Sequence, residues 1–165
     1  MTFKKIVEIL TKNNETISTM ESCTGGGISN AITNIEGASN ILKYSAVTYS
    51  NEYKIKMGVS SNVIEKYSVY SIETAHEMAK NISLFANSDY GVGITGKLNR
   101  ADINNNYGQD NVVFISVFDK KKEMFYDKSI IVTDNSREKN KKTVLLTVKE
   151  LLEDILGIKK ATMKK

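Results

Sequence analysis

The residues best suited to chemistry in this sequence lie in one short segment, residues 21–27 (ESCTGGG). Its serine, Ser22, ends a predicted strand, and the glycines that follow let a ligand approach the backbone closely. The N–H groups of the next helical turn can bind an anion or a tetrahedral oxyanion. Ser22 is therefore a candidate nucleophile. The alternative is a plain turn, because Ser and Thr also cap helices and glycine is common in turns.

The histidine content limits which base can activate this serine. A Ser-His-Asp mechanism needs a histidine, and the sequence has one, His76. His76 lies one residue off the apolar stripe of a predicted helix, so we interpret it as a partly exposed surface residue. A nucleophilic Ser22 then needs another base. A buried lysine is the usual substitute, because desolvation lowers the pKa of an ammonium group.

Residues 48–54 (TYSNEYK) supply such a lysine, running from the end of a predicted strand into a short helix. The carboxyl ends of strands in an α/β sheet meet at the ligand-binding edge. Tyr49 and Lys54 could therefore both face Ser22, and we expect Lys54 Nζ or Tyr49 Oη to lie within hydrogen-bond reach of the serine hydroxyl. If Lys54 is the base, activity is expected to rise with pH as the lysine loses its proton. The alternative is a capped helix with a solvated Lys54.

Two further features deserve comparison with this pair. Ser136 and Lys139 have a Ser-x-x-Lys spacing, but they lie in a run without apolar residues, so we interpret the run as a solvent-facing helix start. Arg137 in the same run can still reach a phosphate. Cys23 at a helix N-terminus would be a reactive thiol, although a small, partly buried filler is the interpretation that we favour.

The elements that must position these residues follow from the periodicity of apolar residues. Helices are predicted over residues 3–10, 28–35, 51–57, 72–86 and 144–155. Strands are predicted over residues 16–20, 43–49, 89–95, 111–118 and 124–132, the last two joined as a hairpin by residues 119–123. This alternation predicts a layered α/β domain with one antiparallel hairpin.

The composition excludes several classes of function. The chain has 165 residues, 41% of them hydrophobic, and a net charge of +4. We expect one domain, residues 1–158, and a disordered basic tail, residues 159–165, which carries four lysines. Without the tail, basic and acidic residues are equal in number, so we expect no nucleic-acid partner. The chain has a single Cys, its longest apolar stretches fall far short of the ~20 residues that span a bilayer, and an acid, Glu8, comes too early for the apolar region of a signal peptide. We therefore expect no disulfide, structural zinc or membrane anchor, and a cytoplasmic location.

The motifs together resemble the CinA C-terminal domain family, the nicotinamide-nucleotide amidases. The resemblance rests on residues 21–26 (ESCTGG), residues 48–51 (TYSN) with Lys54, residues 58–59 (GV) and residues 93–96 (GITG), in the same order. It extends over nearly the whole chain, from about residue 3 to residue 156. ESCTGG followed some twenty residues later by TYSN is a far more specific signal than a lone glycine-rich turn.

This resemblance implies a three-layer α/β/α sandwich whose mixed sheet includes the hairpin. It also implies an amidase that hydrolyses nicotinamide mononucleotide to nicotinate mononucleotide and ammonia, with Ser22 as nucleophile and Tyr49 and Lys54 as its activators. We expect no metal and no cofactor, a pyridine nucleotide as the partner, and free N–H groups in the turn after Ser22. The residues expected to bind substrate are Thr24, Gly25, Gly26, Asn51, Thr95, Gly96 and Arg137.

Two departures from the family pattern leave alternatives open. The family usually has a loop of the form IAGPGGG where residues 97–108 read KLNRADINNNYG, and Lys141 stands where a second arginine is common. One alternative is a catalytically weak nucleotide-binding relative with an altered loop. The other is a structural or partner-binding module that uses the basic tail, whose deletion would then destroy function while Ser22→Ala would not. A homo-oligomer also stays open.

Overall fold

A five-stranded sheet, in the order β2-β1-β3-β4-β5, organises the chain. The computed structural model describes residues 1–99 and 110–159. The strands are β1 (Ile17–Glu21), β2 (Leu42–Val47), β3 (Tyr90–Gly96), β4 (Val112–Asp119) and β5 (Met124–Ile131). The helices are α1 (Lys4–Asn13), α2 (Gly27–Thr33), α3 (Asn51–Lys56), α4 (Ser61–Tyr67), α5 (Ile72–Ala86) and α6 (Arg137–Ile155), with a 3₁₀ turn at Ala38–Asn40.

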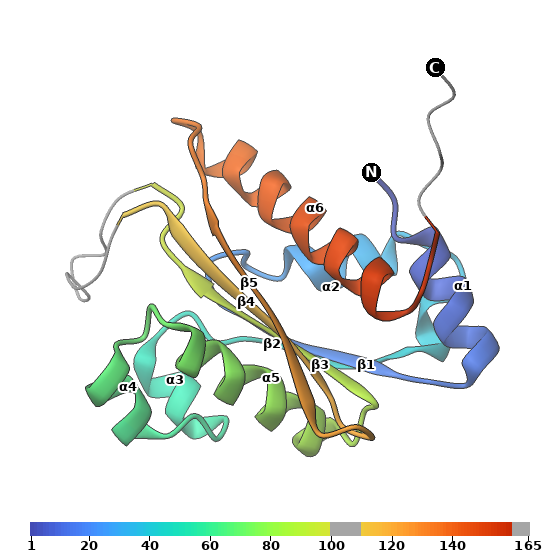
Figure 1. Cartoon of the computed structure of the whole chain (residues 1–165), viewed down its shortest axis with the longest axis horizontal. Coiled ribbons are helices and arrows are strands. Elements are labelled where there is room, and N and C mark those ends of the chain that lie inside the picture. The colour runs from blue at the N-terminus through green and yellow to red at the C-terminus, as the bar shows by residue number, and fades with distance from the viewer. Residues whose placement is uncertain (100–109, 160–165) are drawn as a thin grey trace.

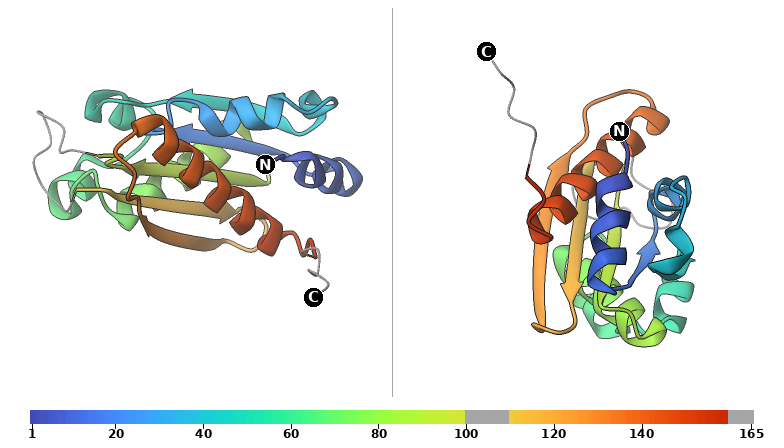
Figure 2. Two further views of the ribbon diagram at one scale, coloured as in Figure 1. Left: turned by 90° about the horizontal axis from the view of Figure 1, so that it is seen from above. Right: turned by 90° about the vertical axis from the view of Figure 1, so that its right-hand side faces the viewer.

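The sheet is mixed and is covered on both faces. β1 pairs in parallel with both β2 and β3, whereas β4 runs antiparallel to β3 and forms a hairpin with β5. Helices α1, α2 and α6 cover one face, and α3, α4 and α5 lie on the other (Figure 1 and Figure 2). The predicted three-layer α/β/α sandwich with one antiparallel hairpin is confirmed.

Burial on both faces explains the apolar character of the central strands. On β1, Ile17 belongs to the core beneath α1, α2 and α6, while Met20 packs with Met78 and Ile82 of α5 in a separate core. Successive strand residues point to opposite faces, so one strand serves both cores. Among the described residues, no helix has the length and apolar character that crossing a membrane requires.

Most predicted elements are present, and two differences have clear causes. α4 was not predicted, because none of its residues is buried and its sequence carries no apolar stripe. α6 begins at Arg137, seven residues before the stripe that starts at Val144. Its cap is Ser136, whose Oγ accepts a hydrogen bond from the backbone N–H of Lys139 at 3.2 Å. The exposed first turn confirms the interpretation of this run as a helix start.

Two glycines let α5 rest directly on the backbone of β3. A Cβ atom at Gly91 would lie 2.0 Å from the carbonyl oxygen of Ala79, and one at Gly93 would lie 2.3 Å from that of Ala75. No side chain fits at either position without moving the helix. This close approach fixes the position of α5 relative to β3.

Replacing Gly93 by Ala is therefore expected to destabilise the fold by about 3 kcal/mol, because backbone, and not a flexible side chain, blocks the added methyl group. The free energy of unfolding in urea measures the effect. Gly157→Ala is the matched control: its Cβ meets nothing within 4 Å, and its φ of +68° is the source of strain, so the cost is about 1–2 kcal/mol. Equal costs at the two positions would contradict this account of α5 packing.

Candidate active site

Ser22 lies at the carboxyl edge of the sheet, between the ends of its two neighbouring strands. Its N–H donates to the carbonyl of Ile94 in β3 at 3.1 Å, and the N–H of Thr48, just after β2, donates to the carbonyl of Glu21 at 2.8 Å. The parallel register places Glu21 opposite both Val47 and Ile94. The end of β1 is thus held from both sides, and Ser22 is 8% exposed.

Lys54 reaches Ser22 from the neighbouring helix α3. Ser50 caps that helix by accepting a hydrogen bond from the N–H of Tyr53 at 3.2 Å. Lys54 follows one turn after the cap and is the buried residue of α3, with 2% exposure. Its Nζ lies 3.1 Å from Ser22 Oγ and 2.7 Å from the carbonyl oxygen of Thr48. The contact predicted between Lys54 and Ser22 is present.

The carboxylate of Glu21 organises the turn from the opposite face of the sheet. It is fully buried and accepts hydrogen bonds from the hydroxyls of Thr19 and Thr24, at 3.0 and 2.8 Å. It also accepts from the backbone N–H groups of Ile28 and Ser29 in the first turn of α2, at 2.8 and 3.1 Å. The N-terminus of α2 is therefore capped by a side chain of the protein.

This capping corrects part of the prediction for the turn. The N–H of Gly25 donates to the carbonyl of Ser22 at 2.9 Å and is not free, and the hydroxyl of Thr24 is bonded to Glu21. Within residues 1–99 and 110–159, the N–H groups of Thr24 and Gly26 have no hydrogen-bond partner. Gly25 and Gly26 have φ values of +61° and +92°, which glycine adopts without a steric cost.

The hydroxyl of Tyr49 is bonded to a residue of α6. Its side chain is 63% exposed, and the hydrogen bond recorded for its hydroxyl among the described residues comes from Arg137 Nη2 at 3.3 Å. Lys141, one turn further along α6, lies near the turn after Ser22: a Cβ atom at Gly25 would be 3.6 Å from its Nζ. The first turns of α6 thus carry both cations, and this end of the helix lies toward the end of the sheet where β1 finishes (Figure 1).

The remaining predicted substrate residues lie around the end of β3. Thr95 is fully buried, and its hydroxyl donates to the carbonyl of Val69 at 2.9 Å. At Gly96, a Cβ atom would lie 2.5 Å from the carbonyl oxygen of Val112, so packing against β4 already requires a glycine. Both residues therefore have structural reasons for their identity.

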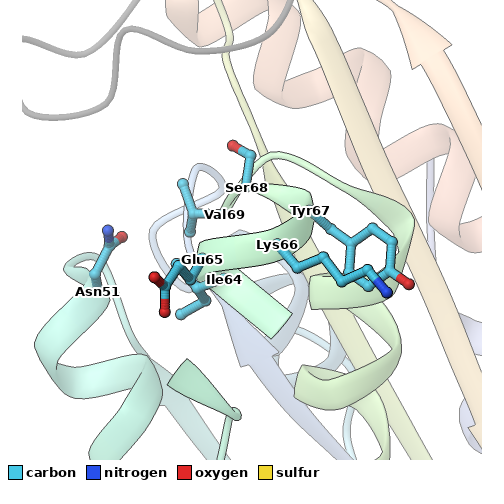
Figure 3. A pocket seen from close by; sticks show the side chains of 7 residues that line it. All are labelled: Asn51, Ile64, Glu65, Lys66, Tyr67, Ser68 and Val69. Atoms are coloured by element: carbon cyan, nitrogen blue, oxygen red, sulfur yellow. The ribbon is translucent and has the colours of Figure 1, made fainter. Parts of the chain in front are cut away.

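Asn51 borders a cavity of about 470 Å³ beside the site. It comes from the first turn of α3, and the other lining residues come from the end of α4 and the segment after it: Ile64, Glu65, Lys66, Tyr67, Ser68 and Val69. Asn51 and Glu65 face one another across the opening, whereas Lys66 and Tyr67 point away (Figure 3). Of the predicted substrate residues, Asn51 lines this cavity, and Thr95 is bonded to Val69 of its wall.

Two features of the site were not predicted from the sequence. Glu21 belongs to the ESCTGG motif but had no assigned role. The one feature of the sequence that could have indicated a role is the position of this acid at the end of an otherwise uncharged strand. Lys97 is also buried, with a side-chain exposure of 1%, and its Nζ lies 3.6 Å from Asp110 and 4.9 Å from the ring centroid of Tyr70. The rest of the unusual loop, residues 100–109, lies outside the described residues, as do residues 160–165 of the predicted tail.

Cys23 and His76 take the structural places expected of them. Burial raises the pKa of the Cys23 thiol from 9.0 to about 12, against an opposing effect of the nearby Lys54. A thiol with this pKa is a poor nucleophile at neutral pH. His76 is a partly exposed residue of α5, with its Nε2 2.6 Å from Asp127 Oδ2 of β5, the far edge strand of the sheet. Cys23 is therefore a weaker candidate nucleophile than Ser22, and His76 lies against β5.

The sequence model of the family described as "CinA C-terminal domain" matches residues 2–156. The chain belongs to this family. A relative from Thermoanaerobacter sp. (strain X514), provisionally named as a competence-damage inducible protein, is 34% identical over 155 residues, 93% of this chain and 37% of the relative. A CinA-like protein from Fervidobacterium nodosum is 46% identical over 92 residues, 55% of this chain and 22% of that protein. The chain thus spans little more than a third of the first relative.

Solved CinA structures share the fold of this CinA domain. The competence/damage inducible protein CihA from Agrobacterium tumefaciens superposes with a TM-score of 0.79 at 26% identity, over 93% of this chain and 90% of that one. A CinA superfamily protein from Klebsiella pneumoniae 700603 gives a TM-score of 0.85 at 18% identity, over 94% and 95% of the two chains. The second likeness, at its low identity, bears on the fold alone.

The raised pKa of Cys23 predicts slow alkylation of the folded CinA domain. At pH 8 the buried thiol stays protonated, so iodoacetamide should label it much more slowly in buffer than in urea, as followed by mass spectrometry. Because the folded pKa lies above the unfolded value of 9.0, the contribution of this thiol to stability is complete below pH 9. It is lost as the pH rises toward 12. Equal labelling rates in buffer and in urea would contradict this prediction.

Proposed function

We propose that this CinA domain is an amidohydrolase that converts nicotinamide mononucleotide to nicotinate mononucleotide and ammonia. The observation that carries the proposal is the pair formed by Ser22 and Lys54, whose Oγ and Nζ atoms lie 3.1 Å apart at a buried edge of the sheet. The substrate comes from the resemblance of the ESCTGG and TYSN motifs to nicotinamide-nucleotide amidases. We place the activity in the cytoplasm as part of the same proposal.

In the first half of the reaction, Ser22 attacks the carboxamide carbon of the substrate. Lys54 must be a neutral amine to accept the serine proton. The carbonyl of Thr48, 2.7 Å from Nζ, accepts one amine N–H and so orients the nitrogen relative to Ser22. Burial of Lys54 supports this role, because removal from water disfavours a charged amine. Ammonia then leaves with the proton that Lys54 has accepted, which produces an acyl-enzyme.

In the second half, Lys54 accepts a proton from water as the water attacks the acyl-enzyme. Lys54 then returns this proton to Ser22 Oγ as the C–O bond to the serine breaks, which releases the product acid as its carboxylate and restores the neutral amine. Both tetrahedral intermediates carry an oxyanion that needs hydrogen-bond donors. The N–H groups of Thr24 and Gly26 are the candidates in the turn, since that of Gly25 is bonded to Ser22. In this proposal the N–H groups of Thr24 and Gly26 bind the oxyanion, as predicted from the sequence, and Gly25 forms the turn through its bond to the carbonyl of Ser22.

The cations of α6 suit the phosphate of a mononucleotide. Arg137 and Lys141 are one helical turn apart, and Lys141 Nζ lies near Gly25. Guanidinium binds phosphate through paired N–H groups, while an ammonium acts as a point charge. The cavity beside Asn51 and Val69 offers room for a further part of the substrate.

A second candidate function is nucleotide binding without turnover. Tyr49, which the resemblance assigns to serine activation, is bonded to Arg137, and the loop after β3 departs from the family pattern. A binding protein would hold the nucleotide at Arg137 and Lys141 and release no ammonia. An assay that measures binding and ammonia separately distinguishes the two functions.

Ammonia release from nicotinamide mononucleotide tests the proposed chemistry directly. Ser22→Ala should lower kcat at least about 10³-fold, because the nucleophile is lost. Lys54→Arg should lower it about 10²- to 10⁴-fold, since a guanidinium stays protonated and cannot accept the serine proton. For wild type, kcat should rise with pH as Lys54 loses its proton. Lys56→Arg is the matched control, because Lys56 is on the same helix, exposed and paired with Glu52.

Near wild-type turnover in Lys54→Arg would exclude Lys54 as the base. Wild-type protein that binds the nucleotide, as measured by calorimetry, but releases no ammonia would favour the binding function. Loss of activity in Lys56→Arg as well would indicate a general effect of altering α3.

Tyr49→Phe separates two roles of the tyrosine. The hydrogen bond from Arg137 predicts that Tyr49 orients the guanidinium for substrate, so its loss should raise KM severalfold and leave kcat within about twofold. A tyrosine that relays the serine proton would instead produce a fall in kcat of about 10²-fold or more. Steady-state kinetics with nicotinamide mononucleotide distinguish these outcomes.

A further inference from the structure

Glu21 and Ser22 are consecutive residues at the end of β1, and their side chains therefore point to opposite faces of the sheet. Ser22 faces Lys54, while the Glu21 carboxylate lies on the side of α2. The carboxylate is fully buried, and the hydrogen bonds that it accepts come from neither Ser22 nor Lys54. A buried carboxylate is costly unless its oxygens are bonded to donors.

Four donors converge on this carboxylate. Oε1 accepts from the Thr24 hydroxyl and the Ile28 N–H, at 2.8 Å each. Oε2 accepts from the Thr19 hydroxyl at 3.0 Å and the Ser29 N–H at 3.1 Å. These donors belong to the strand before Ser22, the turn after it and the helix beyond. One side chain thus joins the turn to the strand before it and to the helix after it.

The turn itself needs such a constraint. Gly25 and Gly26 adopt left-handed conformations, and glycines leave a chain with more conformational freedom than other residues. The backbone bonds of the turn, from Gly25 to Ser22 and from Gly27 to Thr24, are local. The side chain of Glu21, by accepting from the Thr24 hydroxyl and from the N–H groups of α2, connects the turn to strand β1.

We propose that Glu21 is a positioning residue for the nucleophile: by bonding Thr24 and the start of α2, its carboxylate holds the turn so that Ser22 Oγ faces Lys54. This inference rests on the proposed role of Ser22 and adds a residue that acts through the turn. It concerns the reactivity of Ser22, whichever amide is the substrate.

A glutamine cannot replace this glutamate, although its shape is nearly the same. Either orientation of the amide places its NH₂ group where one carboxylate oxygen was. There it faces one hydroxyl, which can rotate and accept, and one backbone N–H, of Ile28 or Ser29, which cannot. Glu21→Gln therefore leaves a buried N–H against another donor and displaces the turn.

The test measures the rate at which phenylmethanesulfonyl fluoride modifies Ser22, followed by mass spectrometry of the full chain. Glu21→Gln should slow this reaction about 10- to 100-fold, as expected for a misplaced nucleophile. Glu153→Gln is the matched control: Glu153 is also buried, lies on α6, and pairs with Lys149 at 2.7 Å. The control should stay within about twofold of wild type. With nicotinamide mononucleotide, Glu21→Gln should lower kcat per folded molecule and leave KM unchanged.

A variant that keeps the carboxylate covers the case in which Glu21→Gln does not fold. Thr19→Val removes one donor to Oε2 and leaves the other three, so it should slow modification of Ser22 at least about threefold. A purely structural role would lower the melting temperature of these variants without altering the reactivity of the folded molecules.

Equal modification rates in wild type and Glu21→Gln would overturn the proposal. Absence of modification at Ser22 in wild type would overturn both this inference and the proposed function. Slowed modification in the variant, together with no ammonia from nicotinamide mononucleotide in wild type, would support the positioning role and reject the proposed substrate.

Discussion

The burial of one amine, that of Lys54, is the constraint on which the rest of the site depends. A lysine side chain leaves water only when its nitrogen finds partners, and here these include the hydroxyl of Ser22 and the carbonyl of Thr48. Both partners stand at the carboxyl ends of adjacent parallel strands. α3 must therefore begin directly after β2, which the cap at Ser50 ensures.

The residues of the site lie on both faces of the sheet. On one face, α3 brings Lys54 to Ser22, and Thr95 ties the segment between α4 and α5 to β3. On the other face, Glu21 joins β1 to α2, and α6 carries Arg137 and Lys141 toward the same edge. Adjacent residues of β1 thus belong to opposite layers. The alternation of a strand lets one short motif supply both an anchor, Glu21, and the proposed nucleophile, Ser22.

Much of this arrangement could be predicted from the sequence. Apolar stripes predicted α1, α2, α5 and the second half of α6, and runs of β-branched residues predicted the strands. Side chains that face the core recur at the period of the helix or strand, so their positions can be recognised in the sequence. The lack of a usable histidine indicated a lysine base, and motif order indicated Lys54. α4 left no trace, because none of its residues is buried. The partner of Tyr49 could not be predicted, because its place in the motif does not reveal that its hydroxyl meets Arg137, 88 residues away in the chain.

The sequence by itself determined the layered α/β class, the candidate nucleophile and its lysine. Local periodicity and residue chemistry carry that information. Only the tertiary structure decided which donors remain for an oxyanion, which partner Tyr49 takes and what Glu21 does. Each of these depends on a distance between segments far apart in the chain, or on competition among several donors for one acceptor. Such competition is resolved by packing, since a buried carboxylate accepts from whichever N–H and hydroxyl groups the assembled layers bring to it.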